Sequence, residues 1–184
     1  MKKRIFIGSF IRVNGLEEKY ENVKKDFDKY ILGRWSPLEN LHITYKFIGE
    51  IDKEKIKEIH KILKSELDRK IETEIVLKGL NAFPNIYSPK ILYISVEDKE
   101  NFLRDCHKFI EDKLSLLGFP KSQQNFIPHI TLMRIKKFRK NKFIQTIKKS
   151  DNFTFGIQTN IEINIIESIL LPSGAKYKKL ELLK

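Results

Sequence analysis

Two copies of a His-x-Thr tripeptide stand out among the residues whose side chains can do chemistry. The first copy contains His42 and Thr44, and the second contains His129 and Thr131, 87 positions further along the chain. Side chains two apart in a strand project to the same face, so each imidazole is expected to stand beside its hydroxyl. Packing asks for apolar residues and gives no reason to repeat the same polar pair, so the repeat indicates a functional site.

Two imidazoles and two hydroxyls that converge on one small volume suit the cleavage of a phosphate ester. One neutral histidine takes a proton from water, the other, protonated, gives a proton to the departing oxygen, and the hydroxyls hydrogen-bond the non-bridging oxygens. Histidine serves both roles near neutral pH because its ordinary pKa is about 6.5. A bound phosphate would raise the pKa of one imidazole by favouring its charged form. This chemistry requires no metal ion, and spacing alone does not say which histidine is the acid.

The remaining histidines are expected to be structural or to face solvent, and the single cysteine is expected to be structural. His60 and His107 fall in predicted helices and have no partner at metal-ligand spacing, so neither a metal site nor any other cofactor is predicted. Cys106 lies among apolar residues at helical spacing, which favours a place in the core over a role as a nucleophile.

The charge balance favours an anionic partner, with nucleic acid first among the possibilities. Basic residues outnumber acidic ones by 36 to 24, a net charge of +12. The run KKFRKNK, residues 136–142, directly follows the second motif and is expected at the rim of the site, where it would attract RNA phosphates. Two plainer interpretations stay open: such a run is by default a solvated helix start, and abundant lysine also reflects genome composition or a hot habitat.

Hydrophobic patterning predicts a cytoplasmic protein with no membrane partner. No run of 18 or more apolar residues occurs, and the opening MKKRIFIGSFIRV has too short an apolar core for a signal peptide. We expect a monomer, because two internal repeats would already supply the symmetry that dimers often provide.

The duplication extends beyond the two tripeptides. At the same offset, RIFIGSF (4–10) aligns with ILYISVE (91–97), and EIVLKGL (74–80) aligns with IEINIIE (161–167). Three segments that share order and spacing indicate an internal repeat. The predicted organisation is one bilobal domain over residues 1–184, with repeats at about 4–80 and 91–167 and a closing strand at about 176–183, after Pro172, Ser173 and Gly174.

Each repeat shows the same order of elements, with β-branched and aromatic runs for strands and apolar residues three or four apart for helices. The expected strands cover residues 4–11, 41–48, 72–80, 91–97, 127–135 and about 160–171. The expected helices cover residues 16–32, 53–69, 99–117 and 140–149. The fold class is therefore α+β: two lobes related by a pseudo-twofold axis, each a mixed β-sheet with covering helices, and an active-site cleft between them.

The motifs also resemble a known family. NLHITYKFIGE and PHITLMRIK are similar to the paired signature of the two-histidine phosphoesterases, and in particular to the RNA 2',3'-cyclic phosphodiesterase branch, the 2'-5' RNA ligase family. RIFIGSF resembles the opening strand of that family, and SILLPSGAKYKKL resembles its closing turn and strand. The resemblance implies hydrolysis of a 2',3'-cyclic phosphate at an RNA or oligonucleotide end to a 2'-phosphomonoester, without a metal or a nucleotide cofactor.

The resemblance also implies roles for the motif residues. His42 would protonate the leaving 3'-oxygen, His129 would be the base for water, and Thr44 and Thr131 would hold the phosphate. It further places Phe47 and Arg134, each five residues beyond its histidine, in the nucleotide pocket as substrate-binding residues. Simple alternation points the other way, because five is odd and turns both side chains away from the histidines unless a bulge intervenes. For Phe47 a core role therefore stays open.

Lys46 is a further candidate for binding substrate. It has the same parity as His42 and Thr44, which would bring its ammonium to the phosphate. The alternative is an exposed lysine at a sheet edge.

Two other functions remain open at this stage. The same acid and base also serve the reverse reaction, in which a cyclic end is joined to a 5'-hydroxyl as a 2'-5' linkage. An RNA-end-binding module without turnover would use the basic surface alone. Both His-x-Thr pairs weigh against it, since a pure binder would prefer the permanent charges of arginine and lysine to imidazoles that titrate.

Overall fold

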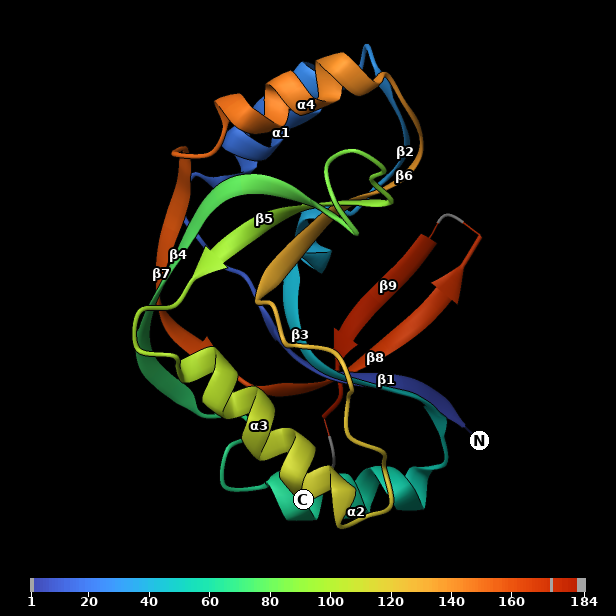
Figure 1. Cartoon of the computed structure of the whole chain (residues 1–184). Coiled ribbons are helices and arrows are strands. Elements are labelled where there is room, and N and C mark those ends of the chain that lie inside the picture. Colours follow the sequence, from blue (N-terminus) through green and yellow to red (C-terminus); the bar gives the residue numbers. More distant parts are fainter. Residues whose placement is uncertain (1, 173, 182–184) are drawn as a thin grey trace.

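The computed structural model describes residues 2–172 and 174–181 (Figure 1). The strands are β1 (Lys3–Phe10), β2 (Ile31–Trp35), β3 (His42–Ile51), β4 (Lys70–Phe83), β5 (Ile91–Glu97), β6 (His129–Phe138), β7 (Thr154–Glu162), β8 (Asn164–Leu171) and β9 (Gly174–Lys179). The helices are α1 (Leu16–Phe27), α2 (Lys53–Leu63), α3 (Phe102–Ser115) and α4 (Lys140–Lys149), and a short 3-10 helix covers Leu38–Asn40.

Two sheets form the two lobes, and each sheet takes strands from both halves of the chain. One has the order β3-β1-β8-β9 and the other has the order β2-β6-β5-β4-β7. The run β3-β1-β8 matches β6-β5-β4 under the repeat, so the third strand of each repeat lies in the sheet of the other. Figure 1 shows the strands β3 and β6, which carry the motifs, between the two ends of the molecule. The α+β class with two related lobes is confirmed.

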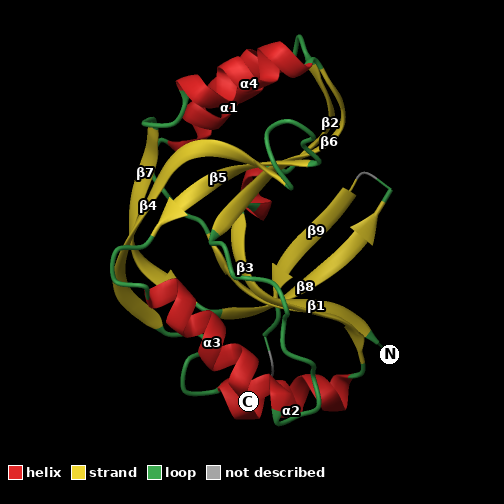
Figure 2. Ribbon diagram, viewed as in Figure 1, coloured by secondary structure: helices red, strands yellow, loops and turns green. Residues whose placement is uncertain are grey.

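The helices are exchanged between lobes in the same way. In Figure 2, α1 and α4 lie together at one end, against the five-stranded sheet, and α2 and α3 lie together at the other end. The helix α1 follows β1 but contacts β7 and α4, while α3 follows β5 but packs on β3 and α2. No helix in the described ranges is long and apolar enough to cross a membrane.

The expected mixture of strand directions is wrong. Neighbouring strands in both sheets pair antiparallel, and the parallel contact in the described chain is an isolated bridge between Leu67 and Ile163. A strand-helix-strand order commonly produces a parallel pair by crossing over one face of its own sheet. Here the chain leaves β1 for the other lobe, forms α1 and β2 there, and returns to β3 from the opposite end.

The predicted helix at 16–32 is too long, because it includes a strand. The helix α1 ends at Phe27, and Ile31–Trp35 forms β2, which pairs antiparallel with β6. Tyr30 and Ile31 continue the helical spacing of apolar residues, but Ile31 is buried as part of a strand. Hydrogen bonds to β6 outweigh the local preference, and a contact so distant in sequence leaves no local pattern.

The predicted strand at about 160–171 is two strands in different sheets. The strand β7 ends at Glu162 in the five-stranded sheet, and β8 begins at Asn164 in the other. The buried Asn164 amide marks the crossing, where it donates to Glu162 Oε1 at 2.8 Å and to Asp68 Oδ1 at 3.2 Å. The closing strand is β9, Gly174–Lys179, and the predicted positions 182 and 183, like Ser173 before it, lie outside the described residues.

Gly33→Ala is expected to lower the free energy of unfolding by about 1–3 kcal/mol, the usual cost of forcing an extra group into packed structure. A Cβ at Gly33 would stand 2.1 Å from the Arg134 carbonyl oxygen and 2.8 Å from Met133 Cε. Urea unfolding measures the loss. The matched control is Leu32→Ala at the exposed neighbouring position, expected to change stability by less than about 0.5 kcal/mol. An unchanged midpoint for Gly33→Ala would mean that β2 and β6 are not packed this closely.

Candidate active site

The two predicted histidines begin equivalent strands that meet between the lobes. His42 is the first residue of β3 and His129 is the first residue of β6, and these strands are in contact although they belong to different sheets. The charge of His129 contributes to lowering the pKa of His42, which places the imidazoles within electrostatic reach of each other. His129 and Thr44 line one pocket. The two motif strands therefore meet between the lobes, although His42 and Thr131 are not among the residues that line this pocket.

Each imidazole is oriented by the same backbone contact. His42 Nδ1 lies 2.6 Å from the carbonyl oxygen of Asn40, and His129 Nδ1 lies 2.7 Å from the carbonyl oxygen of Ile127. A carbonyl oxygen only accepts, so Nδ1 carries the hydrogen in both rings. The Nε2 atom is then the ring nitrogen that is available to take or give a proton. Both rings can thus act as base when neutral and as acid when charged.

Aromatic side chains and a buried amide hold His42 in place. Its ring lies 4.8 Å from the Phe6 ring of β1 and 4.9 Å, edge to face, from the Tyr177 ring of β9. The Asn40 amide donates to the Ala175 carbonyl oxygen at 2.7 Å and accepts from the Tyr177 backbone N–H at 3.1 Å. Asn40 therefore anchors β9 and also provides the carbonyl that orients His42.

His129 has an equivalent aromatic setting. Its ring meets Phe83 edge to face at 4.9 Å and lies 5.3 Å from the Tyr93 ring. Tyr93 is the repeat counterpart of Phe6. The alignment of RIFIGSF with ILYISVE could therefore have predicted that these two aromatic side chains occupy equivalent positions beside the histidines. Phe83, like Tyr177 and Asn40 on the other side, has no counterpart in the three aligned segments and was missed.

Burial lowers the pKa of both histidines. For His42, removal from water is the largest cause, the Asn40 carbonyl opposes it, and the nearby His129 adds to it. For His129, burial is again the largest cause and the Ile127 carbonyl opposes it. Both pKa values lie below 6.5, so the two rings are neutral at pH 7 in the free protein.

Matching bulges change which side chains share the face of the histidines. The pairing of β1 with β3 skips Tyr45, and the pairing of β5 with β6 skips Leu132, its repeat counterpart. Beyond each bulge the parity is reversed, so Phe47 pairs with Phe6 and Arg134 pairs with Ile91 on the histidine side of their sheets. The alternation that turns both residues away is therefore wrong.

Phe47 lines the same pocket as Thr44 and His129. Its side chain is 52% exposed, which excludes a core role, and the Arg4 guanidinium lies 4.7 Å from its ring centroid. Thr44 and Thr131 are half-buried on their strands. In the described part of the chain, neither threonine hydroxyl hydrogen-bonds another protein group, which leaves both able to bind a ligand oxygen.

Arg134 is exposed and directly faces Arg34, a residue that sequence reasoning missed. The two arginines are register partners in the β2–β6 pair, and no acidic side chain in the described ranges forms an ion pair with either. Like charges opposite each other in a sheet are destabilising by themselves. A pair of arginines in this arrangement is suited to share an anion.

The bulge also overturns the predicted position of Lys46. Its backbone pairs with buried Ile7, so it does not share the face of His42 and Thr44. The Lys46 ammonium donates to both carboxylate oxygens of Glu111, at 2.9 and 2.7 Å, and to the Pro120 carbonyl at 2.6 Å. All three donors are engaged, so Lys46 lines the pocket wall as a structural tie.

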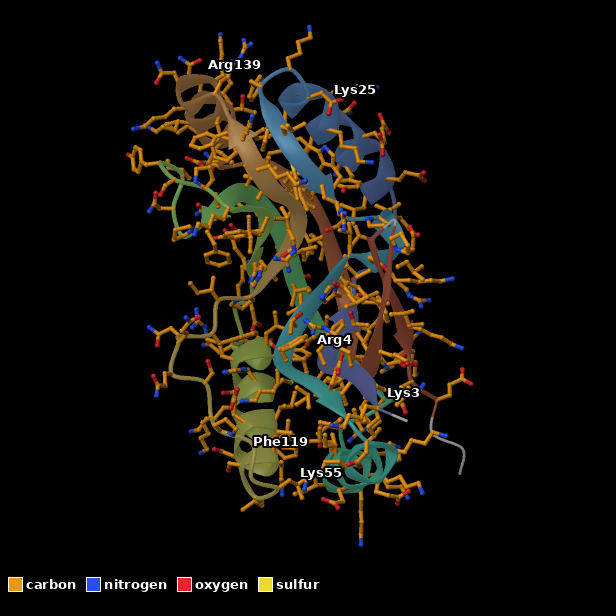
Figure 3. The ribbon with its side chains drawn as sticks, turned by 90° about the vertical axis from the view of Figure 1, so that its right-hand side faces the viewer. Lys3, Arg4, Lys25, Lys55, Phe119 and Arg139 are labelled. Atoms are coloured by element: carbon orange, nitrogen blue, oxygen red, sulfur yellow. The ribbon has the colours of Figure 1, made fainter. Side chains whose placement is uncertain are left out.

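The basic run 136–142 is not at the rim of this pocket. Figure 3 places Arg139 at one end of the molecule, opposite Phe119 and Lys55. The lysines that line the pocket are Lys46, Lys90 and Lys121. The run lies at the end of β6 and the start of α4, whose first turn extends it away from the motif.

No group of three or more histidine, cysteine or acidic side chains placed to hold a metal ion occurs among residues 2–172 and 174–181.

His60 lies in α2 and is half-buried. His107 lines the pocket, and its Nδ1 lies 2.9 Å from the Tyr45 carbonyl oxygen. The Cys106 thiol is half-buried, and burial raises its pKa to about 12, which suits a packing role.

The fold has close counterparts among solved structures. A crystal structure of the protein TT0787 of Thermus thermophilus superposes with a TM-score of 0.75 at 21% identity, and covers 97% of this chain and 95% of that chain. A crystal structure of E. coli LigT complexed with 3'-AMP gives a TM-score of 0.75 at 18% identity over 98% and 97% of the two chains. At these identities the likeness establishes a shared fold.

Sequence comparison identifies the family. Residues 6–183 match the family described as the AKAP7 2'5' RNA ligase-like domain. A protein of Aquifex aeolicus named RNA 2',3'-cyclic phosphodiesterase is 31% identical over 97% of this chain and 95% of its own length. A protein of the same name from Methanocaldococcus jannaschii is 38% identical over 76% of this chain and 78% of its own. The chain therefore belongs to the 2'-5' RNA ligase-like family.

His42 and His129 are both expected to titrate below pH 6.5 in the free protein, because burial disfavours their charged forms. The unfolded chain then binds more protons than the native one, so the free energy of unfolding falls as pH drops from about 6.5 through the lower native pKa values. Imidazole ¹⁵N chemical shifts measure both values and the Nδ1–H tautomer, with His42→Asn and His129→Asn for assignment. Titration of both rings at or above 6.5 would contradict the burial.

Proposed function

We propose that this protein hydrolyses the 2',3'-cyclic phosphate end of an RNA or oligonucleotide to a 2'-phosphomonoester. The observation that carries the proposal is the pair of histidines with matching Nδ1 contacts, which leave Nε2 of each ring for proton transfer, on two strands that meet where His129 lines the pocket. The curated relatives named RNA 2',3'-cyclic phosphodiesterase support the substrate class. The net charge of +12 suits a nucleic-acid partner.

The reaction is one displacement at phosphorus, and each imidazole carries out one of its two proton transfers. His129 Nε2 takes a proton from water as the water oxygen attacks phosphorus, and the bond from phosphorus to the 3'-oxygen breaks. His42, charged at that moment, gives the Nε2 proton to the 3'-oxygen. The phosphate stays on the 2'-oxygen, and one water is consumed. The order of roles follows the family resemblance, since the two ring environments are alike.

The substrate supplies the charge that the acid needs. Both rings are neutral in the free protein, whereas the reaction needs one of them charged. A cyclic phosphodiester carries one negative charge, and its approach favours the imidazolium form of a neighbouring ring. Hydrogen bonds from the Thr44 and Thr131 hydroxyls hold the non-bridging oxygens as negative charge grows on them, and the guanidinium of Arg134 adds to the positive potential.

His42→Asn and His129→Asn are each expected to lower kcat by about 10² to 10⁴, the usual contribution of a positioned acid or base. Asparagine retains a polar side chain of similar reach but cannot transfer the proton. Hydrolysis of adenosine 2',3'-cyclic phosphate measures the loss, and circular dichroism verifies the fold. His60→Asn in α2 is the matched control, expected to keep full activity. Near-normal turnover by either folded active-site variant would contradict the mechanism.

Activity is expected to persist in excess EDTA, because the proton transfers above use side chains alone. The measurement is the initial rate of cyclic phosphate hydrolysis before and after exhaustive chelation. Loss of activity on chelation, with recovery on addition of Mn²⁺ or Zn²⁺, would mean that the histidines act as metal ligands.

A further inference from the structure

The pocket that His129 lines is at the upper end of the size range of small-molecule pockets. Its volume is about 1,100 Å³, and pockets that bury a drug-sized ligand measure about 300–1,000 Å³. Thr44, Phe47 and His129 account for only part of the lining. The rest comes from further residues of β3, from the segment 83–91 at the β4–β5 connection, from α3, and from the segment 116–128, which joins α3 to β6. The last two contain none of the motif residues.

Segment 116–128 forms a wall of the pocket although it has no regular secondary structure beyond turns and bends. The pocket residues that it contributes are Pro120, Lys121, Ser122, Gln124, Asn125, Phe126 and Ile127. Loops of this kind depend on side-chain contacts for a defined position. The position of this wall is therefore set by the contacts that the segment makes with neighbouring elements.

A buried ion pair provides that anchor. The side chains of Lys46 and Glu111 are only 11% and 7% exposed. Lys46 Nζ also donates to the Pro120 carbonyl at 2.6 Å, and Glu111 Oε2 also accepts from the Ser122 N–H at 3.1 Å. The pair thus joins β3, α3 and the loop at one point. Buried ion pairs add little net stability, so their value here lies in the geometry that they impose.

The anchored wall presents an aromatic surface. Phe126 stacks on His107 of α3 with ring centroids 4.4 Å apart and planes 8° apart. His107 Nδ1 lies 2.9 Å from the carbonyl oxygen of Tyr45, the residue at the β3 bulge. Phe126 remains half-exposed and lines the pocket, whose lining also includes Lys90 and Lys121, the latter in an ion pair with Asp112. An aromatic side chain beside lysines is the combination that binds single-stranded nucleic acid.

We propose that Phe126, supported by His107 and held by the Lys46–Glu111 pair, forms a base-stacking subsite. This subsite binds the penultimate nucleotide, on the 5' side of the terminal nucleotide that carries the cyclic phosphate. This inference rests on the proposed function, with the terminal nucleotide at Thr44, Phe47 and His129. The preferred substrate is then an unpaired oligonucleotide end, not a cyclic mononucleotide. Phe126 contacts the substrate and His107 supports its ring, whereas Lys46 and Glu111 are positioning residues.

The first test compares two substrates that share the same reacting end. The wild-type kcat/KM for the dinucleotide ApA 2',3'-cyclic phosphate is expected to exceed that for adenosine 2',3'-cyclic phosphate by about tenfold or more, the usual contribution of one stacked base. Phe126→Ala is expected to reduce this ratio about tenfold, mainly through KM of the dinucleotide. The matched control is Phe119→Ala, in the same segment beside Lys55 at the far end of the molecule (Figure 3), which should keep the wild-type ratio.

The second test separates positioning from stability. In Lys46→Met with Glu111→Leu, apolar side chains of similar size replace the ion pair, a change that often leaves stability intact. The anchors to Pro120 and Ser122 are lost, so the substrate ratio should fall as in Phe126→Ala while Tm stays near wild type. The control is Lys57→Met with Glu54→Leu, which makes the same two substitutions at an exposed ion pair. A wild-type ratio in the folded buried-pair variant would overturn the positioning role.

Binding measurements distinguish failure of this subsite from failure of the proposed function. Titration calorimetry with the His42→Asn and His129→Asn double variant gives Kd for the dinucleotide and the mononucleotide without turnover. Tighter binding of the dinucleotide, lost in Phe126→Ala, supports the subsite even if the wild type hydrolyses neither compound. Equal Kd values and equal kcat/KM values for the two substrates would overturn the subsite while leaving the hydrolase intact.

Discussion

The site depends on the hydrogen bond between each imidazole Nδ1 and the carbonyl oxygen two residues before it. At 2.6 Å for His42 and 2.7 Å for His129, these contacts fix the tautomer and leave Nε2 as the ring nitrogen without a hydrogen in the neutral form. They place a constraint on the backbone, because the carbonyl of Asn40 or Ile127 must turn toward the ring just as the strand begins. The same contact in both repeats gives the two rings the same tautomer in similar environments. In the mechanism proposed above, the substrate therefore has to supply the asymmetry between acid and base.

Exchange of elements between the halves is what brings these rings together. The strand β8 completes the sheet of β1 and β3, and β4 completes the sheet of β5 and β6. Neither half of the chain can complete a sheet by itself, so the relative position of the lobes follows from the strands and helices that they share. The walls around the histidines show the same dependence: Tyr177 arrives on β9, anchored by the buried Asn40 amide, and Phe83 arrives at the end of β4.

The charged groups near the site divide into those that hold the structure and those left for a ligand. Lys46 and Glu111 are buried together and join three elements, so their charges are satisfied within the protein. Arg34 and Arg134 face each other on the surface of β2 and β6 and have no such partner in the described ranges. The large excess of basic residues is therefore less informative than the location of these few. Burial and pairing decide whether a lysine or arginine is available to a phosphate, and neither is visible in composition.

Local patterns in the sequence were sufficient to predict the outline of the fold and to suggest the chemistry that we propose. Two His-x-Thr copies at one offset, with two further aligned segments, predicted paired imidazoles, their convergence and a two-lobed α+β architecture, because these follow from periodicity and repetition. The remaining features depend on tertiary contacts. The bulges at Tyr45 and Leu132 reverse the faces of Lys46, Phe47 and Arg134, the β2 strand ends α1 early, and β7 and β8 separate into different sheets. Each of these outcomes is set by pairing with a strand distant in the chain, and such contacts contribute energy without leaving a pattern among sequence neighbours.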